Sequence, residues 1–140
     1  MPRPTVLVSD LMTSPVITIR KSENLTNAAD EMRLADVRHL AVVDAKGRVV
    51  GMLSNRDLDR ARGRPDATTA QVADVMTDEV LTVKPESHAC EASAILLDHK
   101  IGALPVVDDA GLPVGIISET DFLRVAHVSL GGDRLSDDDD

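Results

Sequence analysis

The stretch Gly51-Met52-Leu53-Ser54-Asn55-Arg56-Asp57 occurs a second time as Gly115-Ile116-Ile117-Ser118-Glu119-Thr120-Asp121, 64 positions later. Val8-Ser9-Asp10-Leu11-Met12-Thr13 returns as Val72-Ala73-Asp74-Val75-Met76-Thr77 with the same spacing. A constant offset of this kind indicates two copies of one structural unit. Because a unit this small covers its own apolar face poorly, we expect the two copies to pack face to face and to form clefts along the seam between them.

Each copy begins with a short helical turn, at 9–12 and 73–76, where Ser9 can act as a cap. A strand is expected next, at 16–19 and at 80–83, because β-branched residues gather there. An apolar spacing of i, i+3, i+4 and i+7 that starts at Leu25 predicts an amphipathic helix. The second copy has a similar helix from Ala89.

A hairpin and a last helix complete each copy. Gly47 and Gly111 supply the positive φ that such turns commonly require. The hairpin strands and helices are expected at 40–44, 49–53 and 55–61, and at 104–108, 114–117 and 119–127. We therefore expect an α/β (α+β) fold of two repeats, related by a pseudo-two-fold axis, with packed small sheets. The expected boundaries are repeat one at 8–61, a linker at 62–71, repeat two at 72–126 and a disordered acidic tail at 131–140.

Composition excludes several classes of protein. The net charge is −9 and only 1% of the 140 residues are aromatic, whereas nucleic-acid binding needs a basic surface and usually aromatic platforms. The single cysteine, Cys90, allows no intramolecular disulfide and fits a reducing compartment. No signal-peptide pattern or membrane-spanning run occurs, so we expect a cytoplasmic protein without membrane partners.

The two Gly-to-Asp stretches carry the most chemistry. Ser54 and Ser118 each precede a predicted helix, with an aspartate three residues later. This spacing is close to a capping box, in which the two side chains satisfy backbone donors. The functional alternative is that the hydroxyl and the helix N-terminus receive phosphate oxygens while Asp57 or Asp121 accepts the hydroxyls of a ribose. The sequence leaves both interpretations open.

Together, these patterns resemble the CBS domain, a small module that occurs in tandem pairs called Bateman modules. The resemblance rests on both Asp-apolar-Met-Thr stretches, on Leu104-Pro105-Val106-Val107-Asp108 and on both Gly-to-Asp stretches. It covers about residues 8–126 and implies a stand-alone bacterial protein of this kind. The family binds mostly adenosine nucleotides in the clefts between paired sheets, and its pairs commonly form homodimers through their helices.

The resemblance implies Asp57 and Asp121 as ribose residues, with Ser54 and Ser118 near phosphate. Thr18 and Thr82 would face the base. Because a guanidinium can bond two phosphate oxygens, Arg38 and Arg56 are candidate phosphate partners or, alternatively, solvated surface charges. The full set of expected nucleotide-binding residues is Thr18, Val37, Arg38, Leu40, Ser54, Arg56, Asp57, Thr82, Ile101, Ala103, Pro105, Ser118, Thr120 and Asp121.

The two copies differ within this set. The second copy has Gly102 where the first has Arg38, and Thr120 where the first has Arg56. The first has Ala41 in place of Pro105. We therefore expect stronger phosphate neutralisation in the first site, better base packing in the second, and unequal binding.

Other chemistry has weaker support. The four histidines, His39, His88, His99 and His127, show no metal-ligand spacing. A nucleophilic Cys90 would need a partner base and a lowered pKa, and the sequence identifies neither. The leading hypothesis is a non-catalytic sensor that binds AMP, ADP or ATP, needs no cofactor and signals to an unknown effector protein. The alternatives are a ligand-free dimerisation or docking module and, less favoured, an enzyme.

Overall fold

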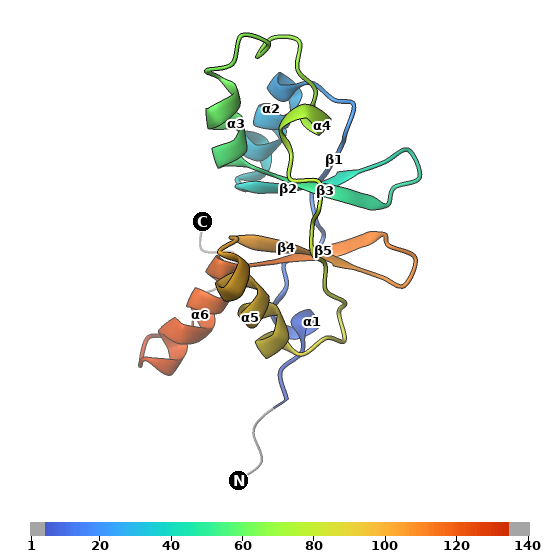
Figure 1. Cartoon of the computed structure of the whole chain (residues 1–140). Coiled ribbons are helices and arrows are strands. Elements are labelled where there is room, and N and C mark those ends of the chain that lie inside the picture. The colour runs from blue at the N-terminus through green and yellow to red at the C-terminus, as the bar shows by residue number, and fades with distance from the viewer. Residues whose placement is uncertain (1–4, 135–140) are drawn as a thin grey trace.

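Two small antiparallel hairpins face each other at the middle of the molecule, and the helices lie on their outer sides (Figure 1). The structure is a computed structural model and describes residues 5–134; the expected acidic tail therefore lies largely outside the described residues. The first half holds a three-stranded sheet with order β1-β2-β3, and the second a two-stranded sheet, β4-β5. The expected α+β fold with packed small sheets is confirmed.

The elements follow the predicted order closely. In the first half they are β1 (Thr18–Arg20), α2 (Leu25–Ala35), β2 (His39–Val43), β3 (Val49–Ser54) and α3 (Asn55–Ala61). In the second half they are α5 (Ala89–His99), β4 (Ala103–Val107), β5 (Pro113–Ser118) and α6 (Glu119–Ser129). Two short helices, α1 (Val8–Leu11) and α4 (Val72–Val75), precede them. Leu7, not Ser9, is the N-cap residue of α1.

The expected strand at 80–83 does not form. Only Val83 forms a parallel bridge, to Val106. In the first half, the Ala41 N–H donates to the Ile17 carbonyl at 3.3 Å, but the equivalent residue of the second half is Pro105, which has no N–H. This missing bond explains why β1 has no full counterpart.

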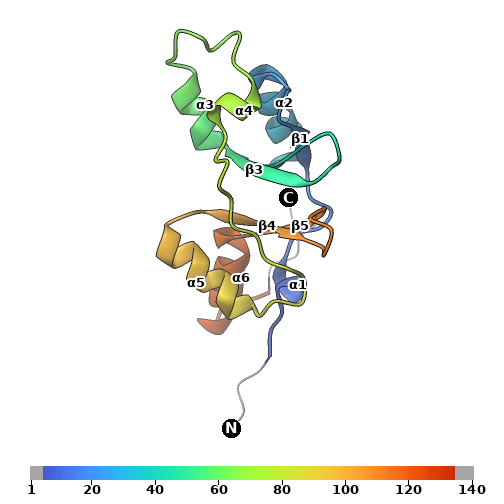
Figure 2. The same cartoon turned by 45° about the vertical axis from the view of Figure 1, so that its right-hand side comes forward.

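The short helices exchange places between the halves. Val8 of α1 is fully buried in the core of the second half, and its N–H donates to the Ser87 carbonyl at 2.8 Å. Val72 of α4 is fully buried in the core of the first half, and its N–H donates to the Glu23 carbonyl at 2.8 Å. Figures 1 and 2 show α1 beside α5, and α4 on the side of α2 and α3. Each half is therefore completed by a segment from the other copy.

The segments that follow α1 and α4 cross the seam as short extended stretches. Thr13 pairs with Ile116 of β5 through N–H to carbonyl bonds of 2.8 and 3.0 Å, and Thr77 pairs with Met52 of β3 through two bonds of 3.0 Å. We call 12–13 and 76–77 the crossing segments. They add a short antiparallel pairing to each hairpin, so the two halves are interlocked by backbone hydrogen bonds.

Glycines in β3 and β5 allow the crossing segments to lie this close to the hairpins. A Cβ at Gly51 would lie 2.6 Å from Met76 Sδ and 2.8 Å from the Thr77 carbonyl oxygen. A Cβ at Gly115 would lie 2.7 Å from Met12 Sδ and 3.0 Å from the Thr13 carbonyl oxygen. The first residue of each Gly-to-Asp stretch is therefore set by close packing against a crossing segment.

Each half has a core of aliphatic side chains between its sheet and its helices. Large, fully buried side chains include Leu40 and Leu53 in the first half and Leu104 and Ile117 in the second. These are equivalent positions of the repeat, because Leu40 and Leu104, like Leu53 and Ile117, are 64 residues apart. The repeat in the sequence is thus a repeat of core positions.

Candidate functional site

Both Gly-to-Asp stretches run from a strand directly into a helix. Ser54 is the last residue of β3 and the N-cap of α3, and Ser118 is the last residue of β5 and the N-cap of α6. The segment just before the preceding strand lies alongside: the Asn55 N–H donates to the Arg38 carbonyl at 2.8 Å, and the Glu119 N–H donates to the Gly102 carbonyl at 3.0 Å. The structure therefore brings 37–40 next to 54–57 and 101–104 next to 118–121.

Asp57 uses one of its two carboxylate oxygens in capping. The Ser54 N–H donates to Asp57 Oδ2 at 2.9 Å, and the Asp57 N–H donates to Ser54 Oγ at 3.1 Å. No hydrogen bond from any residue within 5–134 reaches Asp57 Oδ1. The side chain is half-buried, so Oδ1 remains an acceptor for a bound molecule.

Asp121 is bound on both oxygens. Oδ2 accepts the Ser118 N–H at 2.8 Å and the Ser118 hydroxyl at 3.2 Å. Oδ1 accepts the Thr13 hydroxyl at 3.3 Å and an Arg124 guanidinium N–H at 3.4 Å. The residue is only 5% exposed. Burial raises the pKa of Asp121 above its ordinary value, although the hydrogen bonds from Ser118 and Thr13 and the charge of Arg124 oppose the shift.

His39, for which the sequence offers no metal-ligand spacing, lies at the seam, where its ring approaches Gly102 of the second copy. It starts β2, pairs with Ser54 and lies among charged neighbours. Burial lowers the pKa of His39, the charges of Asp57 and Glu119 oppose this, and those of Arg38 and Arg56 reinforce it. Its position between two expected site residues, Arg38 and Leu40, was the signal that could have identified it.

The side chains of the other expected site residues differ in their exposure to solvent. Exposed side chains are Thr18, Arg38, Arg56, Thr82 and Thr120; half-buried ones are Val37, Ser54, Ile101 and Ser118; buried ones are Leu40, Ala103 and Pro105. Leu40 belongs to the first core, so only its backbone is available to a ligand. Thr18 lies opposite Ala41, which in turn lies opposite Met52, two residues before Ser54.

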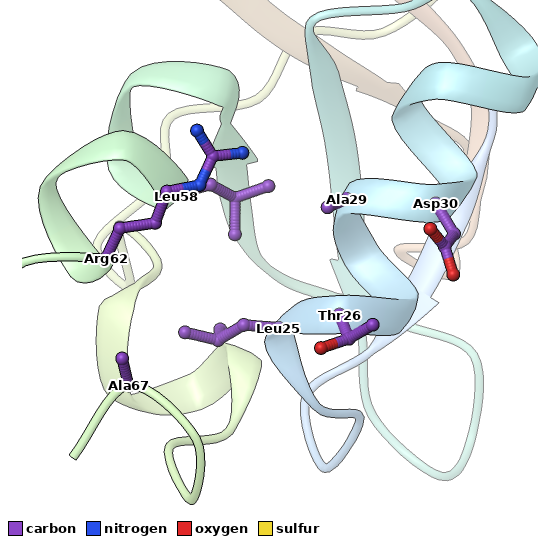
Figure 3. A pocket seen from close by; sticks show the side chains of 7 residues that line it. All are labelled: Leu25, Thr26, Ala29, Asp30, Leu58, Arg62 and Ala67. Carbon is purple, nitrogen blue, oxygen red and sulfur yellow. The ribbon is translucent and has the colours of Figure 1, made fainter.

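Two grooves lie away from the seam, on the helices, and were not expected from the sequence. One, of about 210 Å³, lies between α2, α3 and the linker. In Figure 3, Leu58 of α3 and Arg62, the C-cap residue of that helix, face the α2 side chains Leu25 and Ala29, with Ala67 below. The other, of about 540 Å³, follows α6 and is lined by Thr120, Leu123, Arg124, Ala126, His127 and Leu130.

Metal and membrane sites have no structural support within residues 5–134. No group of three or more His, Cys, Asp or Glu side chains is placed to hold a metal ion in this part of the chain. None of the helices in the same range has the length and hydrophobicity that crossing a membrane requires.

Comparison with known proteins identifies the repeat. The family model for the CBS domain matches the chain twice, at residues 8–64 and 72–128. The chain is 32% identical over 111 residues to the homoserine O-acetyltransferase of Methanohalophilus mahii, which corresponds to 79% of this chain and 22% of that enzyme. The chain thus spans about a quarter or less of the first curated relatives that it matches.

Two solved structures cover nearly the whole chain. The CBS domain pair of protein MJ0100, in complex with 5′-methylthioadenosine and S-adenosyl-L-methionine, has a TM-score of 0.84 and 26% identity, over 90% of this chain and 99% of that one. CBSX2 in complex with AMP has a TM-score of 0.74 and 28% identity, over 89% of this chain and 98% of that one. The ligands in both of these structures contain adenosine.

Proposed function

The chain belongs to the CBS-domain family, and on this premise we propose that it is a non-catalytic sensor that binds an adenosine-containing ligand at the seam. The observation that carries the proposal is Asp57 Oδ1, which accepts no hydrogen bond from residues 5–134. Asp57 follows the exposed Arg56 in a stretch whose backbone is hydrogen-bonded to that of the exposed Arg38. A ribose offers two neighbouring hydroxyl donors, which a carboxylate can accept, and a phosphate offers the oxygens that guanidinium groups bind. Adenosine ligands in two similar CBS pairs support this class of ligand.

In this proposal Asp57 accepts the ribose hydroxyls, and Arg38 and Arg56 bind phosphate oxygens. The neighbouring backbone segment 37–40 contacts the base, with the half-buried Val37 as the apolar surface. Asp121 occupies the equivalent position in the second copy, where both carboxylate oxygens already accept hydrogen bonds. A ligand that contacts both halves changes the balance between their arrangements only by its difference in affinity for them, which is how binding becomes a signal.

We also propose that the protein is a cytoplasmic homodimer. Leu34, Leu97 and Leu123 are 79%, 76% and 67% exposed on α2, α5 and α6, and a dimer formed through these helices would remove their apolar surface from water. Sedimentation equilibrium tests this: Leu97→Glu combined with Leu123→Glu is expected to yield monomers. A wild-type monomer at high concentration would contradict it.

The second candidate function, a ligand-free docking module, has its own supporting observation. The Ser54 and Asp57 side chains already satisfy each other's backbone N–H groups without a ligand, as a purely structural capping box would. Its effector would bind the exposed helices, not the seam.

Isothermal titration calorimetry with AMP, ADP, ATP and S-adenosylmethionine separates the two functions. At least one ligand is expected to bind the wild type, and Asp57→Asn is expected to weaken it at least tenfold. Asp59→Asn is the matched control, because Asp59 is an exposed carboxylate on the same helix that pairs with Arg62 at 2.8 Å. Absence of heat with all four ligands would favour the docking function, and equal losses in both variants would contradict the role of Asp57.

A further inference from the structure

The two Gly-to-Asp motifs differ in how fully their aspartates are already bonded. Asp57 retains a carboxylate oxygen that accepts no hydrogen bond from residues 5–134, whereas both oxygens of Asp121 are taken by Ser118, Thr13 and Arg124. A ribose diol would have to displace at least one of these donors from a site that is 5% exposed. The two copies of the motif therefore differ in whether the aspartate has an oxygen left to accept a hydrogen bond from a ligand.

One of the two donors to Asp121 Oδ1, the Thr13 hydroxyl, comes from the other copy. Thr13 belongs to the crossing segment that pairs with Ile116, so its hydroxyl is held over Asp121 by two backbone hydrogen bonds. Its equivalent in the repeat is Thr77, which pairs with Met52 in the same way. Within the described residues, however, the Thr77 hydroxyl makes no hydrogen bond to Asp57.

The side chains around the second motif also offer an anionic ligand less positive charge and less space. Arg38 and Arg56 of the first motif are replaced by Gly102 and Thr120. The ring of His39 fills the space beside Gly102, since a Cβ there would lie 3.3 Å from His39 Nε2. The second motif thus lacks the two cations and has a side chain from the first copy beside it.

We propose that the chain binds one adenosine ligand, at Asp57, and that Asp121 instead serves as a clasp that holds the first crossing segment on the second half. The ligand part rests on the proposed function; the clasp does not. Asp121 and Thr13 are 108 residues apart in the chain, so their bond ties the start of the first copy to the end of the second.

Calorimetric stoichiometry and paired variants test the ligand part. We expect one ligand per chain, a loss of at least tenfold in affinity with Asp57→Asn, and a change of less than about threefold with Asp121→Asn. In a parallel NMR titration of the wild type, the amide signals of 54–57 shift and those of 118–121 stay in place. Two ligands per chain, or a larger loss with Asp121→Asn, would overturn it. No binding of any ligand would instead refute the proposed function.

Thermal unfolding tests the clasp independently of any ligand. Thr13→Val is expected to lower the midpoint by roughly 3–5 °C, because Asp121 loses a donor in a buried site. Thr77→Val is the matched control, with the same change of shape at the equivalent position, and is expected to shift the midpoint by less than about 1 °C. Equal shifts in the two variants would overturn the clasp.

Discussion

The imidazole of His39 lies across the seam from Gly102, so close that a Cβ at position 102 would approach Nε2 to 3.3 Å. A residue of the first copy is thereby packed on the backbone of the second, among the charges of Asp57, Glu119, Arg38 and Arg56. Burial at this position lowers the pKa of His39.

Acid is expected to destabilise the fold through His39. Burial lowers its pKa below 6.5 in the folded protein, so below about pH 6.5 the unfolded chain binds more protons and the unfolding free energy falls, by at most about 1.4 kcal/mol per pH unit for one group. Urea unfolding at pH 7.5, 6.5 and 5.5 measures this slope. His39→Gln should reduce it and His99→Gln, an exposed control, should not; an unchanged slope in His39→Gln would contradict the prediction.

A side chain at Gly51 or Gly115 is expected to destabilise the protein. An alanine Cβ would collide with a methionine sulfur and a backbone carbonyl of a crossing segment, at 2.6 and 2.8 Å for Gly51, and the carbonyl cannot turn away without losing its pairing. Gly51→Ala and Gly115→Ala should each cost about 1–3 kcal/mol. Gly63→Ala, whose Cβ would meet nothing closer than 3.8 Å, serves as the control in denaturant unfolding, and a similar loss there would speak against the steric explanation.

The N-caps of α2 and α5 provide a matched pair. Asn24 accepts the Asn27 N–H at 2.7 Å, whereas His88, the equivalent N-cap of α5, makes no side-chain cap. Asn24→Ala should therefore cost about 1 kcal/mol and His88→Asn should gain up to a similar amount. Opposite shifts in the thermal midpoint are expected; a stabilising Asn24→Ala would be inconsistent with the cap.

Amide hydrogen-exchange measurements can test whether α1 packs in the second half and α4 in the first. Val8→Ala removes a fully buried side chain from the second core, so faster exchange is expected in β4, β5 and α5 although the substitution lies at the start of the chain. Val72→Ala should instead loosen β2, β3 and α2. Each change should cost about 1–3 kcal/mol locally. Protection lost mainly in the same copy as the substitution would refute the exchange.

Local patterns in the sequence predicted most of the elements. The spacing of apolar residues from Leu25 identified α2, and the glycines at 47 and 111 lie in the hairpin turns with φ of 82° and 83°. The strand at 80–83 failed because its partner is proline: β propensity describes a strand by itself, whereas a ladder needs donors on the neighbour.

The sequence could not predict in which half the two short helices pack. Nothing local in Val8 or Val72 states which core each enters, because both copies offer nearly the same apolar surface. The inequivalence of the two aspartates was also hidden, since the Thr13 hydroxyl reaches Asp121 only after the chain has crossed the seam. The sequence did predict unequal binding, but from Arg38, Arg56 and Pro105 and not from this bond.

Because the short helices are exchanged, the assembly of each half depends on the covalent link between the copies. A polypeptide cut within 62–71 would yield two fragments, each carrying the turn that the other one needs, and their reunion would depend on concentration. Joined in one chain, the same fragments meet at a high effective concentration. Dilution therefore cannot separate the copies, and opening one of them strips the other of part of its interior.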